Sequence, residues 1–92
     1  MSLGSAGTPT QTDMLCAAIT YARSKGTVSI VSAGNSNINI TGFSPSGCQD
    51  AIAVGAVDSS TTKASFSNYG AGVLISAPGV SIYSTLPGGT YG

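Results

Sequence analysis

The sequence predicts an α/β domain built on a mainly parallel sheet. Three observations point to this class: a segment with helical periodicity at 8–26, a β-branched run that follows it directly at 27–33, and a second apolar run of strand length at 51–57. A helix leading straight into a buried strand is the second half of a βαβ crossover, which joins parallel strands. Such strands need helices on both faces, yet one helix is expected, so the architecture is predicted to be incomplete.

The segment 8–26 carries helix signals at both ends. Thr10 and Asp13 have the spacing of a capping box, which favours a helix start here. Gly26 suits the position just beyond the last turn, where a left-handed residue commonly ends a helix. Residues recurring at i, i+3, i+4 and i+7 form one apolar stripe, predicted to pack on the sheet: Leu15, Ala18, Ile19 and Ala22.

The remaining elements are expected to be short. Residues 34–50 form a loop rich in Gly, Asn, Ser and Pro, and residues 86–92 have the composition of a turn. No repeat or linker divides the chain, so residues 1–92 are taken as one partial domain. Strand candidates outside the two main runs are residues 1–3, 64–68, 73–76 and 80–84.

Composition excludes several classes of function. The net charge is zero, and charged residues make up 7% of the chain, against about 25% in typical soluble domains. Three scattered cations cannot neutralise a run of phosphates, so a nucleic-acid partner is not expected. No apolar stretch approaches the roughly 18–20 residues of a membrane helix. A surface so poor in charge suggests that much of it faces other protein, either more of the same domain or a second copy.

Four stretches resemble the catalytic domain of subtilisin-like serine proteases (subtilases), in the order that the family has them. Any one alone would be weak evidence, but together they cover most of the chain. Residues 1–4 are also similar to the family's substrate-binding strand. The four stretches are SIVSAGN at 29–35, AIAVGAVDSS at 51–60, ASFSNYG at 64–70 and APGVSIYST at 77–85.

The resemblance implies part of a secreted, extracellular serine endopeptidase with a three-layer α/β fold and peptide or protein substrates. The family uses an Asp, His and Ser triad, whose motifs lie outside this chain, and the chain contains no histidine. Alone it is therefore expected to be inactive. Many subtilases bind calcium, so calcium is possible in the complete domain. No metal site is expected here, because Gly72 and Leu74 stand where some members place acidic ligands.

By the same resemblance, Asn35 is the catalytic residue of this chain. It matches the asparagine whose side-chain amide stabilises the anionic oxygen formed during acyl transfer. Two short segments match the walls of the pocket for the P1 side chain, and small residues suit close approach of a substrate backbone. These expected substrate-binding residues are Ser2, Leu3 and Gly4 in one segment and Ser32, Ala33 and Gly34 in the other.

The resemblance also bears on two structural features. The family is of a secreted type, so Cys16 and Cys48 are expected to form one disulfide, although two free buried thiols remain an alternative. Such a bridge closes about 31 residues and would stabilise the fold by ~3–4 kcal/mol. Pro45 matches a position where the family often has a cis proline.

Other interpretations remain open. Asn35 could simply occupy a left-handed turn, and the chain could be a non-catalytic peptide-binding or self-associating fragment. Asp13 is most simply a helix cap and Asp58 a turn residue. Lys25 and Lys63 raise the idea of a Ser-Lys dyad, but lysines at a helix end or a surface turn are usually solvated.

Overall fold

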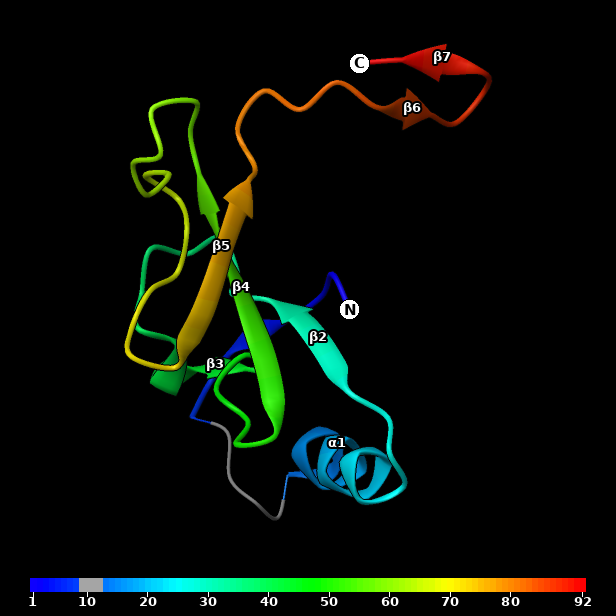
Figure 1. The fold of residues 1–92 in the computed structure, drawn as a ribbon, viewed down its shortest axis with the longest axis vertical. Helices are drawn as coiled ribbons and strands as arrows, with labels where there is room; N and C mark the ends of the chain where they lie inside the picture. Colours follow the sequence, from blue (N-terminus) through cyan, green and yellow to red (C-terminus); the bar gives the residue numbers. More distant parts are fainter. Residues whose placement is uncertain (9–12) are drawn as a thin grey trace.

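A three-stranded parallel sheet forms the centre of the molecule (Figure 1). The structure, a computed structural model, describes residues 1–8 and 13–92. The strands are β2 (Ser29–Ser32), β4 (Ala51–Val57) and β5 (Val73–Pro78), in the order β2-β4-β5. Both pairings are parallel, as predicted for an α/β domain.

Helix α1 (Met14–Ser24) precedes β2 and is shorter than the predicted segment 8–26. Asp13 is its N-cap residue, because a carboxylate oxygen accepts a hydrogen bond of 2.9 Å from the N–H of Leu15. Thr10, the expected partner in a capping box, lies outside the described residues. Within the described part of the chain no helix is long and apolar enough to cross a membrane.

The carboxyl end of α1 agrees with the prediction, whereas the set of residues that the helix buries agrees only in part. Gly26 has a φ of +88°, and its N–H donates to the carbonyl of Arg23 at 3.0 Å. The buried residues of the helix are Cys16 and Ile19, whereas Ala18 is exposed. The predicted apolar stripe is therefore right for Ile19 and wrong for Ala18. Cys16 is buried in its place, because its disulfide with the loop before β4 turns that side of the helix toward the core.

Three of the expected strands, at residues 1–3, 64–68 and 80–84, are absent from the described structure. Residues 64–68 turn after a single backbone bond to β4, in which the Ala64 N–H donates to the Ala56 carbonyl, and the Asn68 N–H donates to the Gly34 carbonyl instead of continuing a ladder. Residues 80–84 are exposed and irregular, and Ser81 has a φ of +55°. The expected turn at 86–92 is instead a hairpin of β6 (Thr85–Leu86) and β7 (Thr90–Tyr91).

The N-terminal segment runs beside β2 without forming a regular strand at residues 1–3. The Ser32 N–H donates to the Met1 carbonyl at 2.9 Å, and the Met1 amino group donates to Ile30, which is the pattern of a parallel pair. The first strand assigned is β1 (Ser5–Ala6). It pairs antiparallel with β3 (Phe43–Ser44), which follows a short 3₁₀ helix η1 (Ile40–Gly42).

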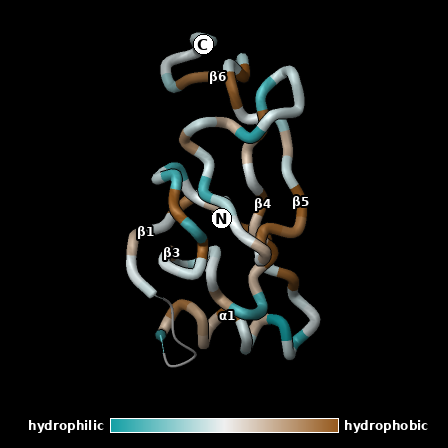
Figure 2. The backbone as a smooth tube through the Cα atoms, turned by 90° about the vertical axis from the view of Figure 1, so that its left-hand side faces the viewer, coloured by the Kyte–Doolittle hydropathy of each residue, from teal (hydrophilic) through white to brown (hydrophobic). Residues whose placement is uncertain are grey.

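The core lies on one face of the sheet. Strand register sets Val31, Ala53 and Val73 side by side, and Ala53 is 0% exposed. The core cluster comprises Cys16, Ile19, Val31, Ala33, Ile40, Cys48, Ala51 and Ala53. Figure 2 shows hydrophobic stretches along β4 and β5.

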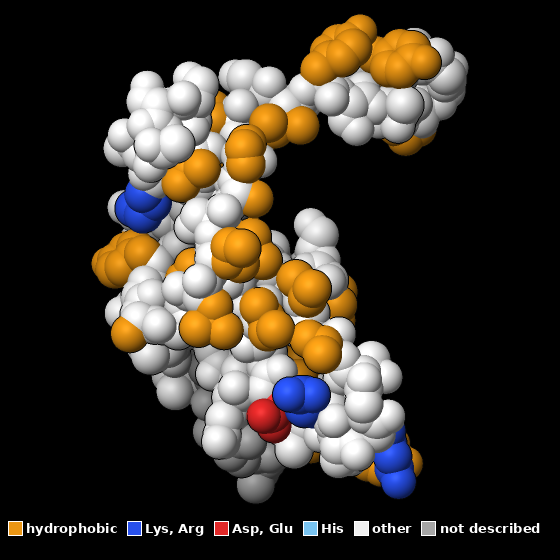
Figure 3. All heavy atoms as spheres, viewed as in Figure 1, with side chains coloured by type: hydrophobic (Ala, Val, Ile, Leu, Met, Phe, Trp, Pro, Cys, Tyr) orange, Lys and Arg blue, Asp and Glu red, His pale blue; other side chains and the backbone are white. Residues whose placement is uncertain are grey.

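The opposite face of the sheet is open. Ile30 pairs with Ile52, and Val54 pairs with Ile75, so these four side chains share one surface. Ile30 is 57% exposed and Ile75 is 59% exposed. Figure 3 shows hydrophobic side chains gathered over the sheet. The expectation that this charge-poor chain leaves a sheet face uncovered therefore agrees with the structure.

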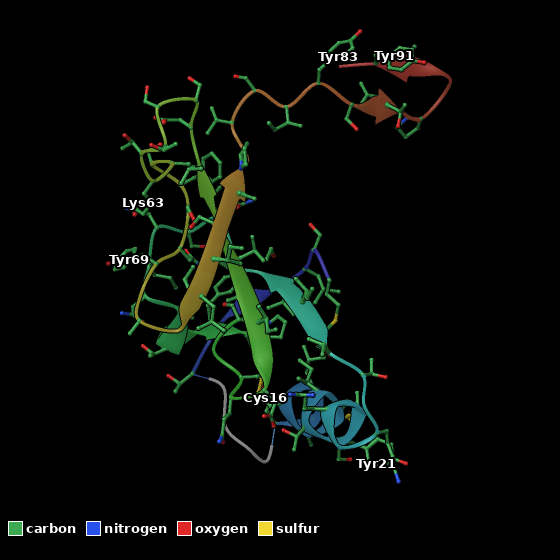
Figure 4. The ribbon with its side chains drawn as sticks, in the orientation of Figure 1. Cys16, Tyr21, Lys63, Tyr69, Tyr83 and Tyr91 are labelled. Atoms are coloured by element: carbon green, nitrogen blue, oxygen red, sulfur yellow. A yellow bond between two sulfur atoms is a disulfide. The ribbon has the colours of Figure 1, made fainter. Side chains whose placement is uncertain are left out.

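The disulfide expected between Cys16 and Cys48 is present. It joins α1 to the loop before β4, with Cα atoms 5.3 Å apart and a sequence separation of 32 residues (Figure 4). Both half-cystines are buried in the core cluster. The bond therefore ties the helix to the strand that follows the loop.

Breaking this bond should destabilise the fold. In the double variant Cys16→Ala/Cys48→Ala, we expect the free energy of unfolding to fall by about 3–4 kcal/mol, because the unfolded chain regains the entropy of the open loop. Urea unfolding of the 92-residue chain, followed by circular dichroism, measures the change. A reducing agent should destabilise the parent chain and leave the variant unaffected, and equal stability of parent and variant would contradict the expectation.

Candidate active site

Asn35 lies just beyond the carboxyl end of β2. The ladder continues for one residue after the strand, since the Ala33 N–H donates to the Val54 carbonyl at 2.9 Å. Gly34 then takes a φ of +101°, a conformation that side chains other than hydrogen rarely allow, and the chain leaves the sheet. Asn35 follows this turn and is exposed. A rigid strand thus carries an accessible carboxamide at its end.

Two neighbouring cavities meet at Asn35. One has a volume of about 400 Å³ and lies between residues 2–6 and the end of β2. The other has a volume of about 410 Å³ and lies over the open face of the sheet, where β2, β4 and β5 contribute to it. The residues that line both cavities are Ser2, Ser32, Gly34 and Asn35. Asn35 therefore lies between the cavity beside the N-terminal segment and the cavity above the sheet.

The structure brings together five of the six expected pocket-wall residues. Ser2, Leu3, Gly4, Ser32 and Gly34 line the first cavity with Asn35. Ala33 does not line it: this residue is 1% exposed, and it borders only the second cavity. The side chain of Ala33 points to the core face of β2 and belongs to the same buried cluster as Cys48 and Ala51, so its place in the pocket wall stays a prediction.

Phe43 forms the floor between the two walls, a role that the sequence did not suggest. A Cβ atom placed on Gly4 or on Gly34 would collide with its ring, so both walls lie directly against it. Phe43 is 7% exposed, although Ser44 and Pro45 follow it in a loop. In the sequence, Phe43 stands out only as an aromatic residue among the small residues of 41–47, which does not indicate a place in a pocket.

The loop below this floor is fixed to β2. The Ser44–Pro45 peptide bond is cis, as the family resemblance implied. The buried Ser46 hydroxyl donates to the Ala33 carbonyl at 3.1 Å. The backbone that precedes Asn35 is thereby held from the side of the loop.

Comparison with known proteins decides the identity of this arrangement. The model of the subtilase family matches residues 1–92. This chain belongs to the subtilase family. The family is one of serine endopeptidases, and it therefore implies peptide or protein substrates.

Individual relatives are similar along almost the whole chain. An extracellular protease of Xanthomonas campestris is 48% identical over 90 residues, which is 98% of this chain and 15% of that protein. Subtilisin Savinase of Lederbergia lenta is 42% identical over 87 residues, 95% of this chain and 32% of that protein. The chain thus spans a third or less of the length of these relatives.

Solved structures agree with the fold. A cold-adapted subtilisin-like serine proteinase superposes with a TM-score of 0.87 at 37% identity, covering 100% of this chain and 32% of that one. A protease of Pseudoalteromonas arctica superposes with a TM-score of 0.79 at 38% identity, covering 86% of this chain and 23% of that one. The described sheet is thus a part of a subtilisin-like architecture.

Lys63 of this subtilase chain is bound rather than freely solvated. Its Nζ donates to Asn37 Oδ1 and to the carbonyls of Ala64 and Ser67, each at 3.0 Å. It also lies 5.5 Å from the centroid of the Tyr69 ring, in the loops beside β5 (Figure 4). These contacts join two loops, and within residues 1–8 and 13–92 none of the hydrogen bonds of Lys63 goes to a serine hydroxyl.

The expectation about metal binding concerns the side chains at positions 72 and 74. Gly72 and Leu74 have no side-chain oxygen to offer a calcium ion. In residues 1–8 and 13–92, no three His, Cys, Asp or Glu side chains gather closely enough to hold a metal. Asp58 accepts hydrogen bonds from the N–H groups of Ser60 and Thr62, as expected for a turn residue.

Substitution of Gly34 should destabilise the chain more than substitution of a glycine in open space. Gly34→Ala combines a positive φ with a collision against Phe43 and Asn68. Gly26→Ala is the matched control, because Gly26 has a φ of +88° and nothing within 4 Å of its Cβ position. We expect a loss of roughly 1–2 kcal/mol for the control and roughly 1–3 kcal/mol more for Gly34→Ala. Urea unfolding measures both, and equal losses would refute the close approach.

Proposed function

We propose that this chain supplies the oxyanion-hole donor and the substrate-binding walls of a secreted subtilisin-like serine endopeptidase. The observation that carries the proposal is the exposed Asn35 at the shared border of two cavities, one of them walled by residues 2–4. The attacking and proton-transferring groups of the family's Asp, His and Ser triad belong to other parts of the catalytic domain. This chain contains no histidine, so it is expected to be inactive alone.

The chemistry assigned to Asn35 follows from where charge develops. When the family's serine attacks a peptide carbonyl, the new C–O bond forms as the π electrons of the carbonyl move onto its oxygen. A fixed N–H donor beside that oxygen stabilises the transition state more than the substrate. The Asn35 Nδ2 group is such a donor, and it needs little reorganisation because the strand before it is held in the sheet. When the carbonyl reforms, the amine leaves with a proton from the triad.

The two pocket walls favour one mode of substrate binding in this proposal. An extended peptide would pair with the exposed backbone edge of residues 2–4 through main-chain hydrogen bonds, which accept many sequences. Its P1 side chain would enter the cavity of about 400 Å³ above Phe43. The volume of this cavity leaves room for a sizeable apolar side chain between the walls.

Secretion is supported by two features. A buried disulfide joins Cys16 to Cys48, and such bonds persist in oxidising compartments. The similar protein of Xanthomonas campestris is named an extracellular protease.

The oxyanion role is tested in a complete catalytic domain. Residues 1–92 replace the aligned segment of Subtilisin Savinase, and hydrolysis of a chromogenic peptide is measured. We expect the chimera to be active and Asn35→Ala to lower its kcat by about 10²–10³, the range measured when a subtilisin loses an oxyanion-hole donor. KM should change much less, because the donor acts mainly on the transition state.

Asn39→Ala is the matched control for this experiment. Asn39 lies in the same loop and is exposed, and its side chain accepts a hydrogen bond of 3.0 Å from the Thr41 N–H at the start of η1. We expect it to keep kcat within about twofold of the parent chimera, because Asn39 lines neither of the two cavities at Asn35 and makes no contact with the reacting carbonyl. A folded chimera without hydrolysis, or an Asn35→Ala chimera with unchanged kcat, would contradict the proposal.

Self-association of the chain is a second candidate, favoured by the open sheet face. Ile30 and Ile75 are more than half exposed on one surface, and adjacent apolar side chains of this kind mark interaction sites. A second copy laid on this face would bury them.

Sedimentation of the 92-residue chain tests this candidate. We expect a dimer whose dissociation constant rises by at least about tenfold in Ile75→Asp, since a buried unpaired charge costs more than 1.4 kcal/mol. Tyr21→Asp is a suitable control, because Tyr21 is 66% exposed on α1, away from the sheet face (Figure 4). A monomer at all concentrations would exclude self-association.

A further inference from the structure

We propose that Asn68 is a positioning residue that holds the Asn35 loop in its working conformation. This inference rests on the proposed function of Asn35. The two residues are 33 positions apart in sequence, and Asn68 acts on the backbone around Asn35 instead of on the substrate.

The Asn68 side chain bonds to the backbone on both sides of Asn35. Its Nδ2 donates to the Ala33 carbonyl at 2.9 Å. Its Oδ1 accepts from the N–H of Ser36 at 2.9 Å and from the N–H of Ile38 at 3.0 Å. A single planar carboxamide therefore fixes the residues before and after the catalytic position.

The backbone of Asn68 adds a fourth bond to the same loop. Its N–H donates to the carbonyl of Gly34 at 2.9 Å. Gly34 lies so close to the carboxamide that a Cβ atom there would collide with Nδ2. Asn68 thus contacts the residues on both sides of Asn35 and leaves Asn35 itself exposed.

Asn68 is itself anchored to the central strand. It is 1% exposed, and the Ser67 hydroxyl donates to its carbonyl at 3.0 Å while accepting a bond from the N–H of Ala56 in β4. Lys63 holds the same turn from outside through its bond to the Ser67 carbonyl. The bonds to the Asn35 loop therefore start from the rigid part of the sheet.

An asparagine suits this position for a chemical reason. Its carboxamide has a donor and a two-fold acceptor on one short planar group, and the Asn35 loop presents one carbonyl and two N–H groups to it. Aspartate offers no donor for Ala33 when ionised, and leucine offers neither donor nor acceptor. Loss of the side chain would leave the part-buried N–H groups of Ser36 and Ile38 without their partner, and the loop would move to satisfy them. The Ala33 carbonyl would keep its bond from Ser46.

Such movement bears directly on the reaction. An oxyanion donor must sit close to the position of the developing charge, and a misplacement of about 1 Å can cost about 10²-fold in rate. Asn35 follows Gly34, whose backbone has a positive φ and little intrinsic preference for one conformation. The four bonds from Asn68 supply that preference.

The test is a double-mutant cycle in the Savinase chimera. We expect Asn68→Leu, which is close in size and cannot hydrogen-bond, to lower kcat by about 10–100-fold while KM changes by less than about threefold. In the Asn35→Ala background, the same substitution should lower kcat by less than about twofold further, because its effect passes through Asn35. Asn68→Asp keeps both acceptor bonds and should show a smaller loss of kcat than Asn68→Leu.

The outcomes separate this inference from the function on which it rests. If Asn35→Ala lowers kcat and a folded Asn68→Leu does not, the positioning role is overturned alone. If Asn68→Leu lowers kcat equally in both backgrounds, its role is structural and the inference is overturned. If Asn35→Ala has no effect, the proposed function fails, and the positioning role fails with it.

Hydrogen exchange keeps the inference testable if a variant does not fold. In the parent chimera, the N–H groups of Ser36 and Ile38 should exchange slowly, because Asn68 Oδ1 accepts both. The N–H of Thr41 is the comparison, since it bonds to the exposed side chain of Asn39 and should exchange faster. Unprotected exchange at Ser36 and Ile38 would overturn the proposed positioning.

Discussion

The pairing of β2 with β4 is the interaction on which the rest of this structure depends. Its register sets Val31 beside Ala53 on the buried face, and the ladder continues past the end of β2 through the bond from Ala33 to Val54. α1 leads into β2, the disulfide ties α1 to the loop before β4, and Asn35 lies just beyond the end of the pairing. A parallel pair buried on one face therefore positions both the core and the candidate catalytic residue.

After β2 ends, hydrogen bonds from polar side chains hold the backbone in place of the β-ladder. Beyond Ala33 no strand holds the chain, and the buried backbone there finds partners in Ser46 and Asn68. Among the described residues no buried side-chain nitrogen or oxygen lacks a hydrogen-bond partner. A fully satisfied network of this kind specifies one conformation, since any alternative would leave polar groups buried and unpaired. The loop can thus be well defined and still present Asn35 to solvent.

The open face of the sheet explains the unusual composition. A chain with 7% charged residues leaves Ile30 and Ile75 more than half exposed, side by side with partly buried neighbours in β4. A complete subtilisin-like architecture has further layers, and the relatives extend well beyond the matched segment. Low charge and exposed apolar strand residues are therefore two aspects of one fact: this surface has the character of an interior.

Four features followed from the sequence alone: the parallel α/β class, the strand at 51–57, the left-handed Gly26 just beyond α1 and, through motif resemblance, the family. Periodicity, capping residues and contiguous motifs are local signals, which a single chain displays directly. Three other features became visible only in the folded chain: the turn at residues 64–68, the core-facing side chain of Ala33, and the contacts of Phe43 and Asn68 with the Asn35 loop. Those outcomes depend on contacts between distant residues, and such contacts override the local preference of a short segment.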